Sequence, residues 1–363
     1  MPTADELLNA TAVQGLIKCL AKASPGQDLG ALRKSAKALD GLSLSERKDV
    51  VRDALLSDLP AGYEPIETLV RTALEDPRFT GWMIWPVSET VTARALGNDS
   101  FDAGLALLAD LTPRLTAEFA IRAMLEADLD RALAIVTTWT NHPDEHVRRL
   151  ASEGTRPLLP WAKRVRAIVT RPESTVDILR ALYRDESAYV RRSVANHLND
   201  LSRADPDLVN AVAAEWLSGE PDAQTQQLVR HGLRTLIKKG NPGALALLGF
   251  APADGLAVDG PTLTGTAVTI GEVLRFSCTL TNGGTEPARL AVDYVIHHRK
   301  ANGTLTPKVF KLATKTLQPG EDVTFERGHS FKVITTRVYH PGEHTIELQV
   351  NGVSYGRTPF TVH

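Results

Sequence analysis

A repeat of about 40 residues constrains the fold of this chain more than any other feature. The apolar positions and the Val-Arg-Arg run of residues 133–149 recur 43 residues later in residues 176–192. A fainter third copy places Val229 39 residues after Val190. Repeats of this length are typical of HEAT and armadillo helix pairs, which stack because one pair cannot bury its apolar face alone. The repeat therefore predicts a curved helical solenoid with a concave face.

The rest of the first 250 residues also has a helical pattern. Ser43 and Glu46 have the spacing of a capping box, and apolar residues follow at helical intervals. The apolar segments 105–111, 115–125 and 129–139 are separated by short breaks that contain Pro or Asp. We therefore predict an all-α domain over residues 1–250.

After Phe250 the pattern changes to that of strands. Residues 251–261 have the composition of a linker, and residues 273–280 then alternate apolar and polar side chains. Further alternating runs, bounded by Asn-Gly and Pro-Gly pairs, give about seven strands in roughly 100 residues, as in an immunoglobulin-like sandwich. The predicted fold is multidomain, α then β: a HEAT-like α-helical repeat solenoid (1–250), a linker (251–261) and an immunoglobulin-like β-sandwich (262–363).

Composition excludes several classes of protein. No apolar run among the 363 residues reaches the ~18–20 residues of a membrane span, and the two cysteines are 259 residues apart. The start of the chain lacks the basic and apolar segments of a secretory signal. Motifs for nucleotide hydrolysis, ester hydrolysis and zinc binding are missing. We expect a cytoplasmic protein, associated with the nucleoid when bound to DNA, that needs no metal or cofactor.

Two repeat segments carry polar side chains that packing alone does not explain. Arg149 and Glu153 share one helical face at i, i+4, and Arg192 and Asp200 lie on the equivalent helix 43 residues later. Stacked repeats would align Arg149 beside Arg192. This ridge is either a solvated face with weak ion pairs or a phosphate-binding surface, because guanidinium groups bind phosphate oxygens bidentately. Residues 141–240 hold 16 basic and 13 acidic side chains, which permits an anionic partner.

Glu118 and Trp161 also stand out. Glu118 interrupts an apolar stretch, so its carboxylate is either at a rim or functional. Trp161 follows Pro160, which predicts a helix that begins there with the indole at its mouth. Packing in the core is the default expectation for Trp161, as for Trp82, Trp85, Trp139 and Trp216.

The segment RRLASEGTRPLLPW (148–161), with YVRRSVANHLND (189–200) and RHGLRTLIKKGNP (230–242), resembles the HEAT-like alkylpurine DNA glycosylases, and most of all their AlkC branch. Some members of that branch also carry a C-terminal immunoglobulin-like domain. The resemblance covers the helical region. It implies a monofunctional enzyme that removes the cationic bases 3-methyladenine and 3-methylcytosine from double-stranded DNA without base flipping.

The resemblance also implies roles for residues. Glu118 is the first choice for the carboxylate that stabilises the oxocarbenium-like sugar, Glu153 and Asp200 support it, and Trp161 presents its ring to the cationic base or the sugar. The expected DNA contacts are Arg148, Arg149, Arg156, Arg191, Arg192, Arg234, and, at a hairpin tip of the sandwich, His298, Arg299 and Lys300, with Lys332 and Arg337 as further candidates. The alternative for the residues of the sandwich is an ordinary polar loop. A monomer is the simpler expectation. The alternatives are a noncatalytic HEAT-repeat scaffold and a DNA-bending protein.

Overall fold

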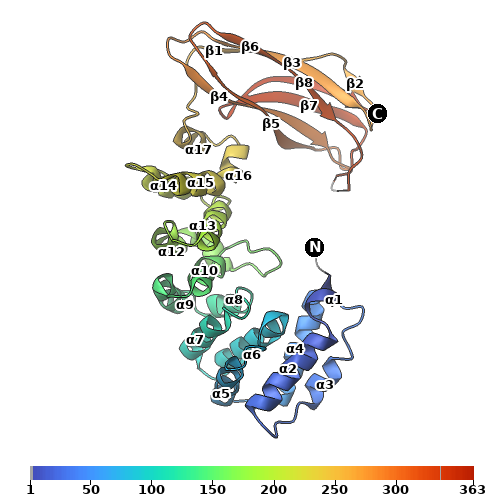
Figure 1. The fold of residues 1–363 in the computed structure, drawn as a ribbon. Helices are drawn as coiled ribbons and strands as arrows, with labels where there is room; N and C mark the ends of the chain where they lie inside the picture. The colour runs from blue at the N-terminus through green and yellow to red at the C-terminus, as the bar shows by residue number, and fades with distance from the viewer. Residues whose placement is uncertain (1–2, 336) are drawn as a thin grey trace. The chain divides into compact units, whose positions relative to one another are not determined.

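The computed structural model describes residues 3–335 and 337–363, and these residues form two compact units (Figure 1). The first unit comprises Met1–Val209 and Pro221–Gly232, and the second comprises Asn210–Glu220 and Leu233–His363. The first is helical, and the second joins the last helices to a β-sandwich. Within the described ranges, no helix is long and apolar enough to cross a membrane.

The helices follow one another from the N-terminus to residue 247. They are α1 (Ala4–Leu7), α2 (Ala10–Ala23), α3 (Gly30–Ser35), α4 (Leu44–Asp58), α5 (Tyr63–Leu74), α6 (Ile84–Gly97), α7 (Phe101–Leu111), α8 (Ile121–Ala127), α9 (Leu129–Thr138), α10 (Glu145–Glu153), α11 (Arg166–Thr170), α12 (Val176–Leu182), α13 (Ala188–Leu201), α14 (Pro206–Leu217), α15 (Ala223–Gly232), α16 (Arg234–Lys238) and α17 (Pro242–Leu247). The division between the two units falls within α14.

The capping box predicted at Ser43 is confirmed. Ser43 Oγ accepts the amide of Glu46 at 3.4 Å, and the Glu46 carboxylate accepts the amide of Ser43 at 2.8 Å. The predicted helix over 115–125 is wrong in its first half, since residues 115–120 form a turn before α8. Thr112 Oγ1 accepts the amide of Ala117 at 3.3 Å. A side chain therefore takes an amide that a helix would have paired with a carbonyl.

The 43-residue repeat extends to the turns that precede α10 and α13. Asp144 and Ser187, which are 43 residues apart, cap these two helices through their side chains. In both helices an arginine anchors the preceding turn: Arg148 Nη1 donates to the carbonyls of residues 142 and 143, and Arg191 Nη1 to those of residues 185 and 186. Helix α10 packs on α13, and α13 packs on α15. The predicted stacking of helical repeats is confirmed.

Eight strands of the described residues form the two sheets of the predicted sandwich. They are β1 (Leu256–Leu263), β2 (Ala267–Val268), β3 (Val273–Asn282), β4 (Ala288–Arg299), β5 (Leu305–Leu317), β6 (Asp322–Ser330), β7 (Gly342–Val350) and β8 (Val353–Val362). One sheet has the order β1-β3-β6 and the other β2-β8-β7-β4-β5. The predicted alternation over 273–280 is confirmed, because Leu274, Phe276, Cys278 and Leu280 are the buried side chains of that run.

The segment before the sandwich is more ordered than a linker. Strand β1 starts at Leu256 and pairs with β3, so the second half of the predicted linker belongs to the sandwich. Arg289 of β4 donates to the carbonyl of Leu248 at 3.1 Å and stacks on the Phe250 ring at 4.5 Å. Asn351 Nδ2 donates to the carbonyl of Ala251 at 2.7 Å. The predicted boundary at residue 250 therefore lies inside the second unit.

Three histidines are buried in the sandwich among aromatic rings. The rings of His329 and His344 lie 6.0 Å and 5.8 Å from that of His298, and Tyr294 Oη lies 3.1 Å from His329 Nδ1. Burial, with a smaller contribution from the Arg337 charge, lowers the pKa of His298 to about 3 and the pKa of His329 to about 4. Burial also lowers the pKa of His344. These side chains are therefore neutral near pH 7.

We expect acid to destabilise the second unit. An unfolded histidine binds its proton near pH 6.5, so between pH 6.5 and about 4 the unfolded chain holds protons that the folded chain lacks. The free energy of unfolding has its full value above pH 6.5 and falls as the pH drops through this window, by up to ~1.4 kcal/mol per pH unit for each such histidine. The loss is measured as the difference in the free energy of urea unfolding between pH 7.5 and 5.0, and hydrogen exchange of the β4 amides shows that it arises in the second unit. His298→Gln should reduce the pH dependence, and an unchanged dependence would contradict the assignment.

Candidate active site

Glu118 lies in the turn before α8 with its carboxylate held toward α10. Arg149 Nη1 donates to Glu118 Oε2 at 2.6 Å, and Thr116 Oγ1 donates to the same oxygen at 3.0 Å. The Arg149 guanidinium also lies 4.8 Å from the centre of the Tyr189 ring on α13. The Glu118 side chain is 12% exposed and that of Arg149 is 14% exposed. The carboxylate is thus oriented by fixed partners but still reaches the surface.

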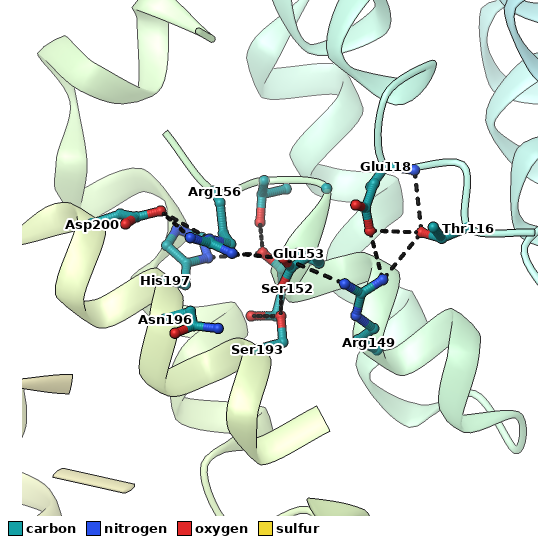
Figure 2. A network of polar contacts seen from close by, with 12 residues as sticks. Thr116, Glu118, Arg149, Ser152, Glu153, Arg156, Ser193, Asn196, His197 and Asp200 are labelled. Carbon is teal, nitrogen blue, oxygen red and sulfur yellow. Dashed lines mark hydrogen bonds and ion pairs between the residues drawn. The ribbon is translucent and has the colours of Figure 1, made fainter. Parts of the chain in front are cut away.

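Arg149 connects Glu118 to a second group of charges between α10 and α13. Its Nη2 lies 3.4 Å from Glu153 Oε1, which accepts a hydrogen bond from Arg156 Nη1 at 2.6 Å. Arg156 in turn donates through Nε to Asp200 Oδ2 at 2.8 Å. Figure 2 shows this chain of contacts running from Asp200 through Arg156 and Glu153 to Arg149 and Glu118. Five residues from three separate segments thus form one polar network.

Small polar side chains fix the orientation of Glu153. Ser193 Oγ of α13 donates to Glu153 Oε2 at 2.6 Å. Next along α13, His197 Nδ1 lies 2.9 Å from the carbonyl oxygen of Ser152. Because a carbonyl oxygen only accepts hydrogen bonds, Nδ1 carries the proton, and Nε2 accepts a hydrogen bond from Thr175 Oγ1 at 3.1 Å. Burial, reinforced by the charge of Arg156, lowers the pKa of His197 to about 3. His197 is therefore a neutral structural group that joins α10 to α13.

Arg122 of α8 holds the loop that follows α10. Its guanidinium donates to the carbonyls of Gly154 at 3.3 Å, Arg156 at 2.9 Å and Pro157 at 3.4 Å, and also to that of Lys163. Burial, followed by the charge of Arg156, lowers the pKa of Arg122 to about 10, so the group stays charged at neutral pH. One buried side chain on α8 therefore sets the path of the loop.

The loop presents Trp161 to solvent. No helix begins at Pro160, so that prediction is wrong, and α11 starts only at Arg166. Trp161 is 75% exposed and has a φ of +64°, a conformation that is uncommon for a residue with a side chain. The default of core packing is wrong for Trp161, whereas Trp85, Trp139 and Trp216 are buried as expected. An indole held in the open by a fixed loop is available to a ligand.

The other predicted arginines of the helical region have different surroundings. Arg192 is exposed on α13. Arg148 is 8% exposed, and its Nε donates to Asp185 Oδ2 at 2.7 Å, so together with its turn contacts this guanidinium is used within the protein. Arg191 anchors the equivalent turn and is half-buried. Arg234 is half-buried at the start of α16 in the second unit.

The predicted hairpin tip of the sandwich borders a basic cavity of about 930 Å³ within the second unit. Its cationic lining includes Lys238, Arg299, Lys300, Lys308 and Arg337. Burial, with the neighbouring charges of Arg337 and Lys238, lowers the pKa of Lys308, as expected where cations are crowded. His298, predicted as a DNA contact, also borders this cavity but is buried and neutral, so it offers no positive charge to DNA.

Sequence reasoning missed four residues of the network. These residues, which orient the predicted site residues, are Thr116, Arg122, Ser193 and His197. Thr116 binds Glu118 two residues away, but the partners of the other three lie 22 to 45 residues away in the sequence. One signal was present in the sequence. Arg122 lies between Ile121 and Met124 on an apolar face, where a charged side chain requires buried partners.

Comparisons with known proteins agree on one family. Residues 34–236 match the family described as DNA alkylation repair enzyme, and residues 257–363 match the C-terminal Ig-like domain described for the uncharacterised protein YhaZ. The chain is 37% identical to the uncharacterized protein YhaZ of Bacillus subtilis (strain 168) over 311 residues, 86% of this chain and 85% of that protein. It is 34% identical to the alkylpurine DNA glycosylase AlkC of Pseudomonas fluorescens, which was solved bound to DNA containing an abasic site analog. That match covers 100% of both chains with a TM-score of 0.83.

Proposed function

This chain belongs to the DNA alkylation repair enzyme family, and we propose that it is a DNA glycosylase that hydrolyses the N-glycosidic bond of 3-methyladenine and 3-methylcytosine in double-stranded DNA. The observation that carries the proposal is the Glu118–Arg149–Glu153–Arg156–Asp200 network, which combines oriented carboxylates with guanidinium groups. The loop after α10, which carries Arg156, also presents the exposed indole of Trp161. The whole-chain likeness to a glycosylase solved on DNA supports the DNA partner.

The chemistry of the substrate suits a site without a strong general acid. A base methylated at N3 is already cationic and leaves readily, so the demand falls on the positive charge that develops on the sugar. Glu118 is the carboxylate we assign to stabilise that charge and to orient the attacking water. Arg149 and Thr116 hold its Oε2, which fixes the carboxylate before the substrate arrives. Glu153 and Asp200 supply further negative charge near the sugar.

The exposed groups around the network serve DNA binding in this proposal. Trp161 offers an electron-rich ring to the cationic base or the sugar, a contact worth roughly 0.5–2 kcal/mol. Arg192, which is exposed on α13, binds a phosphate near the lesion, whereas Arg149 and Arg156, also predicted as phosphate contacts, are paired with the carboxylates of the network. In the second unit, Arg299 and Lys300 at the hairpin tip bind the DNA backbone, together with the other cations of the basic cavity. We propose that the lesion stays out of a deep pocket, in contrast to base-flipping enzymes.

The direct test is release of free bases from methylated DNA by the purified full-length protein in the presence of a chelator. We expect 3-methyladenine and 3-methylcytosine to appear as free bases, leaving abasic sites, with no covalent protein–DNA adduct under reducing conditions. A trapped adduct would indicate a Schiff-base nucleophile and an associated lyase step. DNA binding without any release would favour the scaffold or the DNA-bending protein instead.

Neutralising Arg192 should weaken DNA binding without abolishing it. Its side chain is exposed on α13, so Arg192→Gln leaves the folded network intact. Loss of one phosphate contact should reduce the slope of log K against log[salt] by about 0.9. The measurement is DNA affinity across a salt series. Arg33→Gln, which removes an exposed arginine on α3, is the matched control, and equal slopes for the two variants would remove Arg192 from the interface.

A further inference from the structure

A second cavity lies in the first unit next to Glu118 but outside the charged network. It has a volume of about 850 Å³, and its walls come from α4, α6, α8 and the loop after α10. Phe119, the residue immediately after Glu118, lines this cavity. The side chains of the two residues leave the same turn, with Glu118 bound to Arg149 and Phe119 facing the cavity. The turn that carries Glu118 therefore also forms part of the cavity wall, together with Trp161.

The walls carry three aromatic side chains. The rings of Trp85 and Phe119 lie 4.7 Å apart between centroids, and Trp161 stands at the cavity from the loop that Arg122 holds. Aromatic faces of this kind bind planar heteroaromatic rings through stacking, and the interaction tolerates different bases. Phe119 packs against Trp85, and Lys48 Nζ lies 5.7 Å from the centre of the Trp85 ring, so the exposed Trp161 ring is the aromatic group of the lining most open to a flat ring.

The charges around the cavity nearly cancel. Its lining holds five cationic side chains, Lys48, Arg52, Arg122, Lys163 and Arg164, and four anionic ones, Asp49, Asp53, Glu89 and Glu126. Several of these are already engaged: Glu89 Oε1 accepts from Trp85 Nε1 at 3.2 Å, and Lys48 Nζ lies 3.4 Å from Glu89 Oε2. A phosphate would require an excess of cations, and a metal ion an excess of carboxylates. The balance favours an uncharged polar ring.

We propose that this cavity receives the methylated base after excision. The inference rests on the proposed function, because hydrolysis converts the cationic base into a neutral one. The water oxygen forms a bond to C1′ of the sugar and releases one proton to solvent, the C1′–N bond breaks, and its electron pair returns to the ring nitrogen. The leaving group is then an uncharged, planar, methylated heterocycle, which matches both the aromatic walls and the balanced charge of the cavity. Free base should consequently act as a product inhibitor.

The experiment closes the cavity from an exposed position. Ala123 of α8 and Ala93 of α6 both line it and are exposed, so Ala123→Phe and Ala93→Phe are independent filling variants that leave the core unchanged. Ala134 of α9 is exposed and lies outside the cavity lining, so Ala134→Phe is the matched control. Calorimetric titration of the full-length protein with free 3-methyladenine should show binding to wild type and the control. We expect it to weaken by about tenfold or more in both filling variants.

The outcomes separate this proposal from the proposed function. Inhibition of base release by added 3-methyladenine should lose potency in the filling variants in parallel with the measured affinity. Equal affinity in all variants, or no binding to a wild type that still releases bases, would overturn the cavity assignment and leave the glycosylase intact. If wild type releases no base, the proposed function fails and the product assignment with it. If the filling variants bind abasic DNA more weakly than wild type does, and wild type does not bind free 3-methyladenine, then the cavity holds a base of the DNA instead.

Discussion

Glu118→Gln should reduce the release of 3-methyladenine and 3-methylcytosine by about 10²- to 10³-fold, the typical effect of removing one stabilising group from a developing charge. Gln keeps the shape of the side chain and an oxygen that accepts from Arg149, which is 2.6 Å from the native carboxylate. Only the negative charge opposite the sugar is lost. Single-turnover base release measures the effect, and DNA affinity should stay within a few-fold of wild type.

A matched control distinguishes this role from general electrostatics. Glu173 is exposed in the turn before α12 and is not part of the network, so Glu173→Gln removes the same charge from an uninvolved side chain and should release bases at the wild-type rate. If Glu118→Gln retains full activity while Asp200→Asn loses it, the catalytic carboxylate is Asp200. A loss of DNA affinity equal to the loss of rate would indicate that Glu118 supports binding and not the chemical step.

Arg122→Met should have the largest effect on stability. Arg122 is 3% exposed and donates to four backbone carbonyls of the loop between α10 and α11. Each buried acceptor left without a partner costs about 1–3 kcal/mol, and we expect a total loss of roughly 3–5 kcal/mol in the free energy of unfolding. The loop should loosen and Trp161 lose its fixed position. Urea unfolding measures the first effect, and the rotational freedom of Trp161 fluorescence in a variant that lacks the other tryptophans reports the second.

The control for this prediction lies on the same loop. Arg166 is exposed at the start of α11, so Arg166→Met removes a guanidinium without removing the buried hydrogen bonds and should change the stability by less than about 0.5 kcal/mol. Arg122→Lys keeps the charge but provides a single ammonium group in place of the planar fork, and it should recover only part of the loss. Full stability in Arg122→Met would mean that water satisfies the loop carbonyls equally well.

The local parts of the fold follow from short-range patterns in the sequence. The capping box at Ser43, the caps of α10 and α13 at Asp144 and Ser187, and the alternation over 273–280 all depend on residues within a few positions of one another. Hydrogen bonds of caps and the period of apolar side chains act over that range, so the pattern alone identifies helix or strand. Predictions failed where a side chain replaced a backbone partner, as in the turn that carries Glu118.

The sequence by itself determined the two architectures, the helical repeats, and the i, i+4 pairing of Arg149 with Glu153, because each depends on local spacing. Only the tertiary structure decided the rest. Glu118 meets Arg149 across 31 residues and Arg156 meets Asp200 across 44, contacts that arise when α8, α10 and α13 pack together. The exposure of Trp161 depends on hydrogen bonds that Arg122 makes from another helix, and the neutrality of His298 depends on burial between sheets. Long-range packing sets the exposure of Trp161 and the charge state of His298, and the spacing of neighbouring residues revealed neither.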